Sequence, residues 1–410
     1  MSKIGFGGYR ISYRSGDHKE ALKFAIEEGC SLIDTSSNYT GGESERLIGE
    51  VLAETNSNPL VISKVGYVQG SNIQMVKELG LEEELVTINE KLKHSIHPNF
   101  IDNQLKVSLK RLKAKTIESY LLHNPEYFLK TKGSTKEEMY KRIEKALVFL
   151  ETKVGFNQIK SYGISSNTFV DPKEDHESID ILEILKIIKK NNLKSFKYIQ
   201  FPLNLLELGS QMKQFDGLNL FEVAKKNKLI TLINRPFNSF TDKGLVRLCE
   251  YEVDENLTEE YANESYVELT KTLKEKWNSE RDDEEEEIEE LAVYKQISGL
   301  WFKQNSVDAV EQIFYQYFFP MLTSVWGRSL DPNESKPFFQ LFELAVNYTR
   351  KNMNDRAQDF KKVAKDTGLI DDKDKDLQSL AIDKYFELGA DYVLCGIKSK
   401  EYVENLKNYF

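Results

Sequence analysis

Residues 30–49 read CSLIDTSSNYTGGESERLIG, and this stretch decides the fold. A short apolar run ends at Asp34, a small polar loop carries Tyr39, and a pair of glycines precedes an amphipathic segment. This order predicts a strand, a loop and a helix, because apolar runs, turn residues and helical periodicity each favour one of these structures. We therefore expect an acid at the carboxyl end of a strand and a tyrosine on the loop that follows.

Two further predicted strands end in ionisable side chains. The run that begins at Val61 ends at Lys64, and the run that begins at Tyr120 ends at His123. If these strands are parallel neighbours of the first, their carboxyl ends meet at one rim. The sequence then brings an aspartate, a tyrosine, a lysine and a histidine together.

These four side chains have a joint chemical use. A free phenol titrates near ~10, and a nearby ammonium lowers that pKa. A carboxylate beside Lys64 offsets the cost of burying the lysine charge. We predict Asp34, Tyr39, Lys64 and His123 to be catalytic, with the phenol protonating a developing alkoxide and the imidazole orienting the carbonyl oxygen. A Schiff-base aldolase that uses Lys64 is an alternative chemistry.

Eight predicted strands alternate with helices, near residues 3–6, 30–34, 60–64, 117–123, 159–164, 197–201, 229–233 and 392–396. Alternation indicates a parallel sheet because each crossover needs a helix, and eight units fit an α/β fold, the closed (β/α)8 TIM barrel. The interval 246–376 breaks the rhythm. We predict barrel strands 1 to 7 over 1–245, a large helical insertion between strands 7 and 8 over 246–376, and strand 8 with a C-terminal helix over 377–410.

The predicted insertion has its own composition. It holds six consecutive acidic residues at 282–287, the aromatic pair Trp301 and Phe302, and apolar residues at helical spacing. Runs of like charge are typical of solvated surfaces, and aromatic residues at this spacing are typical of a core. An acidic surface that binds a partner is the alternative interpretation of the run.

Composition excludes several classes of function. A net charge of -10 argues against nucleic acid as the main partner. Three cysteines, an odd and sparse number, do not suggest a disulfide framework, so we expect a reducing, cytoplasmic location. The sequence has no apolar run of membrane-spanning length and no signal peptide core at its beginning. His94 and His97 have neither cysteine nor acid beside them, and we expect no metal site.

Several short strings, in their order and spacing, resemble the aldo-keto reductase superfamily. They include Asp34 to Glu45, Ser63-Lys64 and Leu121 to Glu126, and also Gly5 to Tyr9, Tyr162 to Asn167, Gln200 to Pro202 and Gly396 to Ser399. The resemblance covers residues 1 to about 245 and resumes near 377. It implies NAD(P)H-dependent reduction of an aldehyde or ketone to an alcohol, or the reverse oxidation, with Tyr39 as general acid. A regulatory or interaction protein that binds cofactor on the same fold is the alternative.

The resemblance also implies where the nicotinamide end of the cofactor binds. The family holds its dinucleotide without a Gly-x-Gly-x-x-Gly fingerprint, and this sequence has none. By resemblance, Ser165 and Ser166 with Gln200 bind the carboxamide. The family usually shows Ser-Asn there, so the role of the Asn falls to Ser166 or to Asn167. Gly8 and Tyr9 are implied near the nicotinamide ribose, and Asp34 borders the same site.

Four further residues are implied at the phosphates and the adenosine. Arg235 stands where many members place a stacking tyrosine, and it either stacks, pairs with a phosphate, or forms a structural salt bridge. Lys398 and Ser399 precede the last helix, where the family meets the 2′-phosphate of the adenosine. Asn405 is implied at the adenine. These residues favour NADP as the cofactor, with NAD as the alternative.

Overall fold

The computed structural model describes residues 3–241, 244–262, 264–265, 267–268, 271, 304, 306–326 and 328–410. By contacts within the chain it divides into two compact units, 1–236 with 381–410, and 237–380. The limits predicted from the sequence, 1–245, 246–376 and 377–410, differ from these divisions by a few residues. The predicted domain limits remain a prediction. The acidic run at 282–287 and the pair Trp301 and Phe302 lie outside the described residues.

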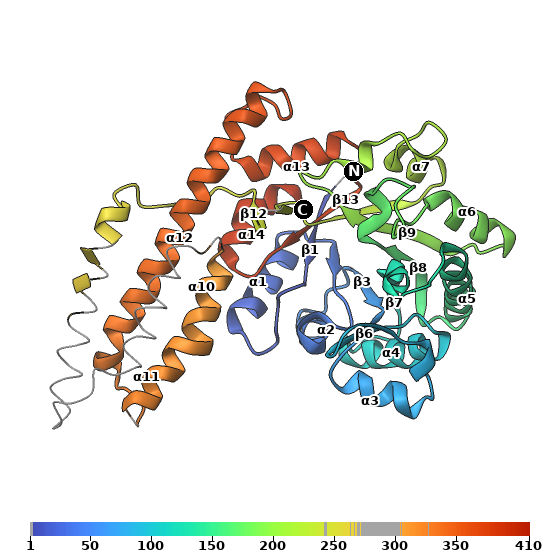
Figure 1. Ribbon diagram of the computed structural model, residues 1–410, viewed down its shortest axis with the longest axis horizontal. Helices are drawn as coiled ribbons and strands as arrows, with labels where there is room; N and C mark the ends of the chain where they lie inside the picture. The colour runs from blue at the N-terminus through green and yellow to red at the C-terminus, as the bar shows by residue number, and fades with distance from the viewer. Residues whose placement is uncertain are drawn as a thin grey trace. The chain divides into compact units, whose positions relative to one another are not determined.

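The first unit is the predicted (β/α)8 barrel (Figure 1). Its eight strands close in the order β1-β13-β10-β9-β8-β7-β3-β2, and every pairing between them is parallel. The strands are β1 (Lys3–Gly7), β2 (Leu32–Asp34), β3 (Leu60–Val65), β7 (Ile117–His123), β8 (Ile159–Ser165), β9 (Phe196–Pro202), β10 (Ile230–Asn234) and β13 (Tyr392–Gly396).

Helices connect these strands, as a parallel sheet requires. They are α1 (Gly16–Glu27), α2 (Glu43–Thr55), α4 (Pro98–Arg111), α5 (Lys136–Gly155), α6 (Ile181–Lys190), α7 (Leu220–Lys226), α13 (Leu377–Glu387) and α14 (Lys400–Leu406). Short 3-10 turns are η1 (Tyr39–Gly42), η2 (Glu82–Glu84), η3 (Pro125–Lys130), η4 (Asn167–Val170), η5 (Gly209–Gln211) and η7 (Lys407–Tyr409).

The barrel interior explains the apolar runs of the sequence. Strands covered on both faces lack polar alternation, because both sets of side chains are buried. One interior layer takes a side chain from each of six strands: Leu32, Ile62, Leu121, Tyr198, Leu232 and Leu394. Strands β8 and β9 approach so closely that a Cβ at Gly163 would lie 1.9 Å from the carbonyl oxygen of Tyr198.

A small sheet follows β3 in a region that holds none of the eight strands predicted from the sequence. It has the order β4-β6-β5 and consists of β4 (Tyr67–Val68), β5 (Val86–Asn89) and β6 (Leu92–His94), with α3 (Ser71–Glu78) between β4 and β5. The pairing is antiparallel and puts Tyr67 opposite His94. Strand β4 begins three residues after Lys64, so the sheet starts near the carboxyl end of β3.

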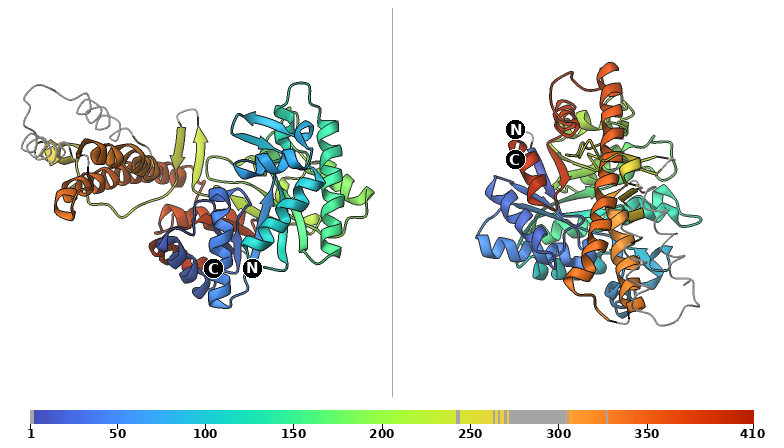
Figure 2. Two further views of the ribbon diagram at one scale, coloured as in Figure 1. Left: turned by 90° about the horizontal axis from the view of Figure 1, so that it is seen from below. Right: turned by 90° about the vertical axis from the view of Figure 1, so that its left-hand side faces the viewer.

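The second unit contains a hairpin and helices (Figure 2). These helices have a hydrophobic core of their own. Its elements are β11 (Asn238–Thr241), β12 (Gly244–Arg247), α10 (Val307–Ile313), the π-helical turn η6 (Phe314–Phe318), α11 (Phe319–Trp326) and the long α12 (Pro332–Asp366). Phe314, Phe318 and Phe338 are buried in that core. The predicted helical insertion between barrel strands 7 and 8 is therefore present, preceded by a hairpin that the sequence analysis did not predict.

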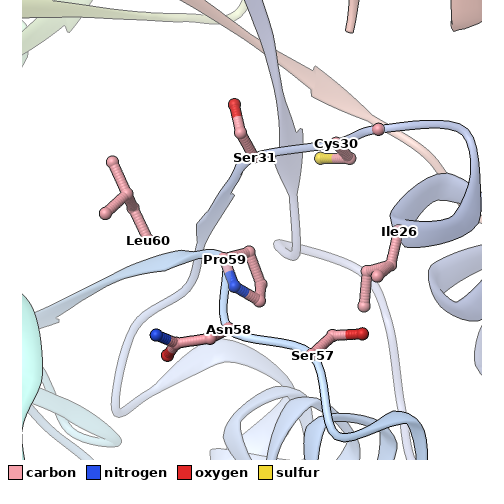
Figure 3. Close-up of a pocket in the computed structure, with 8 residues that line it drawn as sticks. Ile26, Cys30, Ser31, Ser57, Asn58, Pro59 and Leu60 are labelled. Carbon is pink, nitrogen blue, oxygen red and sulfur yellow. The ribbon is translucent and has the colours of Figure 1, made fainter.

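A shallow hollow of about 470 Å³ lies at the amino ends of β2 and β3 (Figure 3). Cys30, Ser31, Asn58 and Pro59 are among its lining residues. It is at the opposite end of these strands from Asp34 and Lys64, so it does not belong to the predicted site. Among the helices of the described residues, none is long and apolar enough to cross a membrane.

Candidate active site

The strand register places the predicted catalytic residues on one rim. Asp34 ends β2 and pairs with Gly7 at the end of β1. Lys64 lies near the end of β3, and His123 ends β7 and pairs with Ser165 at the end of β8. Because all eight strands are parallel, these ends meet at the same mouth of the barrel, where TIM-barrel chemistry is found.

Lys64 joins three oxygen atoms in a completely buried position. Its Nζ donates to Asp34 Oδ2 at 2.7 Å, to the carbonyl oxygen of Thr35 at 2.8 Å and to Tyr39 Oη at 3.0 Å. The lysine side chain is 0% exposed. An ammonium has three hydrogens, so each of its donors is used. Tyr39 Oη accepts from Lys64, which leaves its own phenolic hydrogen to be donated elsewhere.

Burial dominates the proton affinities of Asp34, Tyr39 and Lys64, the trio at the centre of the site. It raises the pKa of Asp34 and lowers that of Lys64, and the ion pair between them opposes both shifts. Burial also raises the pKa of the Tyr39 phenol well above its usual value, and the Asp34 carboxylate raises it further. From the sequence, Lys64 was expected to lower that pKa. The difference arises because Asp34 offsets the lysine charge and the phenol is desolvated.

His123 is a neutral imidazole at the edge of the trio. Its ring centroid lies 6.0 Å from that of Tyr39, and its Nδ1 lies 3.2 Å from Ser36 Oγ. Burial lowers its pKa well below the usual value, and the charge of Lys64 lowers it further. A neutral imidazole has one N–H donor and one acceptor nitrogen, so it can orient a polar group without adding a charge.

The glycine pair seen in the sequence shapes the loop that carries Tyr39. Gly41 and Gly42 have φ values of 68° and 91°, which glycine adopts without strain. A Cβ at Gly42 would lie 2.3 Å from the guanidinium of Arg111. That guanidinium donates to the carbonyl oxygen of Ser37 at 3.0 Å and pairs with the buried Glu45 at 3.2 Å. The Arg111 guanidinium therefore ties the loop to Glu45, and the positive φ of Gly42 favours glycine at that position.

Gln200 connects this trio to the residues predicted for the nicotinamide. Its Nε2 donates to Asp34 Oδ1 at 2.8 Å, and its Oε1 accepts from Ser165 Oγ at 2.9 Å and from Asn234 Nδ2 at 3.4 Å. Asn234 Oδ1 is buried without a hydrogen-bond partner among the described residues. A buried acceptor of this kind suits the N–H of a carboxamide, because leaving it unpaired costs free energy. The residues present therefore fit a nicotinamide here.

Gly8 and Tyr9 border the same mouth from β1. The Gly8 N–H donates to the carbonyl oxygen of Asp34 at 2.8 Å, and a Cβ at Gly8 would lie 2.8 Å from Ser44 Oγ. Tyr9 is 61% exposed, and its ring meets that of Tyr39 edge-on with centroids 5.1 Å apart. Gly8 is thus a position of close backbone approach, and Tyr9 is an exposed aromatic surface beside the phenol.

The segment after β8 is held by a glutamate that the sequence analysis did not select. Ser166 Oγ accepts from the N–H of Thr168, and the N–H of Asn167 donates to Glu126 Oε1 at 3.2 Å. Glu126 is 1% exposed, and its Oε2 is buried without a partner among the described residues. Burial raises the pKa of Glu126 to about 8. Its place three residues after His123 was the signal available in the sequence.

The residues predicted for the phosphates and the adenosine have local partners. Arg235 has a positive φ of 54°. Its Nη2 lies 3.7 Å from Glu207 Oε1, in keeping with the salt-bridge alternative. Lys398 and Ser399 follow β13, whose end pairs with the end of β1, so they lie on the same rim. Ser399 Oγ accepts from Tyr402 N–H at 3.4 Å and caps α14. Asn405 lies in α14 and is exposed.

The two histidines weighed as metal ligands have other partners. His94 Nε2 lies 2.7 Å from the carbonyl oxygen of His123. His97 Nδ1 accepts from the N–H of Asn99 and caps α4. Across the residues that the structure describes, no group of three or more His, Cys, Asp or Glu side chains is placed to hold a metal ion.

Known proteins similar to this chain are oxidoreductases. The sequence model described as "Aldo/keto reductase family" matches residues 3–293. The aldo-keto reductase YhdN of Bacillus subtilis is 24% identical over 238 residues, 57% of either chain. An uncharacterized oxidoreductase of Mycobacterium tuberculosis is 28% identical over 134 residues, 30% of this chain and 33% of that protein. The chain thus spans only a third to just over half of the length of these curated relatives.

Among solved structures, a glycerol dehydrogenase from Gluconobacter oxydans is 17% identical with a TM-score of 0.48, over 99% of this chain and 86% of that chain.

Proposed function

Because this chain belongs to the aldo/keto reductase family, we propose that it reduces an aldehyde or ketone to the alcohol with NADPH and with Tyr39 as the general acid. The observation that carries the proposal is the buried contact of Lys64 Nζ with both Asp34 and Tyr39, at 2.7 Å and 3.0 Å. Family membership supports carbonyl chemistry in general, and this contact supports the role of the phenol. A small carbonyl compound in the cytoplasm is the substrate class and the location that we infer.

Tyr39 supplies the proton in this reaction. When bound, NADPH supplies the hydride to the carbonyl carbon. The raised pKa of Tyr39 keeps the phenol protonated at neutral pH, so the proton is in place before reaction. As the proton moves to the carbonyl oxygen, the phenolate that forms lies beside the Lys64 ammonium, which stabilises it. Neutral His123 orients the carbonyl oxygen, and solvent returns the proton to Tyr39.

The rim residues would hold the dinucleotide. Ser165 and Gln200, with Ser166 or Asn167, would bind the carboxamide. The Oδ1 of Asn234, which has no partner among the described residues, adds an acceptor that was not predicted from the sequence. Gly8 and Tyr9 would flank the ribose, and Asp34 would border it. Arg235 would meet a phosphate or keep its ion pair with Glu207. Asn405 would meet the adenine, and Lys398 with Ser399 would meet the 2′-phosphate that distinguishes NADP from NAD.

The role of Tyr39 is tested by Tyr39→Phe, which keeps the ring and removes the proton. We expect turnover of a generic aldehyde to fall by about 10²–10⁴-fold, the usual contribution of a general acid. The dissociation constant of NADPH should change less than about threefold, because the ring remains. Tyr13→Phe, at a tyrosine 37% exposed, is the matched control. Unchanged turnover in Tyr39→Phe would remove the phenol as the acid.

Cofactor preference is tested by titrating NADPH and NADH in parallel. We expect tighter binding of NADPH, and Lys398→Met should weaken NADPH while leaving NADH nearly unchanged. The fluorescence of the bound dihydronicotinamide reports both. Equal affinities would argue for NAD as the cofactor. Tight NADPH binding without turnover of any carbonyl in a varied set would favour the regulatory alternative.

A further inference from the structure

The small sheet β4-β6-β5 touches the candidate catalytic histidine through two of its residues. Tyr67 of β4 and His94 of β6 lie directly opposite each other in the antiparallel pairing. Both are next to His123, at the end of barrel strand β7. The sheet is not one of the eight strand-helix units of the barrel. Its contacts with His123 are not explained by barrel closure.

His94 contacts the main chain of His123. Its Nε2 lies 2.7 Å from the carbonyl oxygen of His123, and His94 is 1% exposed. A carbonyl oxygen only accepts hydrogen bonds, so Nε2 carries the hydrogen and Nδ1 is the bare nitrogen of the neutral ring. Burial lowers the pKa of His94 to about 4, so the ring is neutral in the physiological range. This contact satisfies a carbonyl group at the mouth of the barrel.

Tyr67 contacts the ring of His123 and the residue that follows it. Its ring meets the imidazole edge-on, with centroids 4.8 Å apart. Its hydroxyl accepts from Asn124 Nδ2 at 2.6 Å and donates to Tyr127 Oη at 3.1 Å. Asn124 has φ 49°, an uncommon conformation that a side-chain hydrogen bond helps to hold.

Gly66, between β3 and β4, lies close to both histidines and has no space for a side chain. A Cβ at Gly66 would lie 2.4 Å from the carbonyl oxygen of His123 and 2.6 Å from His94 Nε2. The Gly66 carbonyl oxygen in turn accepts from the N–H of Ser95 at 2.8 Å. The sheet and the segment that precedes it therefore contact both the backbone and the ring of His123.

We propose that the β4-β6-β5 sheet positions His123, and that His94 is the positioning residue that holds its main chain. The inference rests on the proposed carbonyl reduction, in which His123 orients the substrate. Without the donor at position 94, the His123 carbonyl oxygen loses this buried hydrogen bond, and the imidazole gains freedom to shift. A misplacement of a catalytic group by an ångström costs up to about 10²-fold in rate.

The test compares two variants at position 94 and one at position 97. His94→Gln keeps an N–H donor at nearly the same reach, whereas His94→Met fills similar space without a donor. His97→Leu removes the other histidine of the pair, which only caps α4. We expect His94→Met to lower kcat about 10–100-fold with NADPH affinity changed less than twofold. His94→Gln should restore most of kcat, and His97→Leu should leave it unchanged.

A second readout does not depend on turnover. The chain has only five histidines, so their imidazole ¹⁵N signals can be assigned by substitution. In His94→Met the signals of His123 should shift or broaden while those of His18 and His176 stay, which also shows that the variant is folded. If His94→Met does not fold, His94→Asn, whose amide is too short to reach the carbonyl, takes its place. His123 signals unchanged in the loss variant would overturn the inference, whereas absence of turnover in the parent protein would overturn only the proposed reaction.

Discussion

Glu126→Gln should change how the stability of the barrel depends on pH. Burial raises the pKa of Glu126 from 4.5 to about 8, so the folded chain keeps a proton that the unfolded chain releases. The stabilisation is complete below pH 4.5 and is lost as pH rises towards about 8. At 1.36 kcal/mol for each pKa unit, the loss approaches about 5 kcal/mol across that window. Glutamine cannot ionise, so the variant avoids it.

The assay is urea unfolding of both proteins at pH 5, 7 and 9, followed by far-UV circular dichroism. All three tryptophans lie between residues 277 and 326, so their fluorescence reports the insertion separately. The stability of Glu126→Gln relative to the parent should rise by up to about 4 kcal/mol from pH 5 to pH 9, because about 3 of the pKa units lie above pH 5. Glu137→Gln, at a side chain 79% exposed, should show a change within about 0.5 kcal/mol. An equal difference at pH 5 and pH 9 would refute the reasoning.

Three further substitutions test other parts of the structure. Lys64→Met leaves Asp34 buried without its cation and should lower the free energy of unfolding in urea by about 3–5 kcal/mol. Adding Asp34→Asn should restore part of this loss, and equal stability of the single and double variants would contradict a stabilising ion pair between the two residues. Gly163→Ala puts a methyl group 1.9 Å from a carbonyl oxygen and should cost at least about 1–3 kcal/mol, whereas Gly155→Ala, with nothing within 4 Å, should not destabilise. Phe314→Ala should cost about 3–5 kcal/mol in the tryptophan-monitored transition, and a loss below about 1 kcal/mol would show that the insertion core does not depend on it.

The barrel was predictable because its signals are local. A strand buried on both faces is an apolar run, and several of these runs stop at a polar residue at the mouth, as at Asp34 and His123. Those stops also identified the trio around Lys64, since parallel strands bring their carboxyl ends together. The helical insertion was predictable from the break in the alternation of strands and helices.

The supporting contacts were not predictable, because they depend on pairings between distant segments. Strand β4 has two residues and β6 has three, too few to show a period of two. The partner of His94 is a main-chain carbonyl group, which leaves no trace in side-chain patterns. The proton affinity of Glu126 depends on its burial, and that of Tyr39 depends on burial and on the nearby Asp34 carboxylate.

The order of strands has a consequence for synthesis of the chain on the ribosome. Barrel closure needs β13, which pairs with both β1 and β10. About 160 residues separate Asn234 from Tyr392, and at about 5–20 residues per second they take roughly 10 to 30 s to emerge. Throughout that interval seven strands are outside the ribosome with the edges of β1 and β10 unpaired, an arrangement prone to aggregation. Nascent chains of this protein should therefore depend on holding chaperones until the last strand arrives.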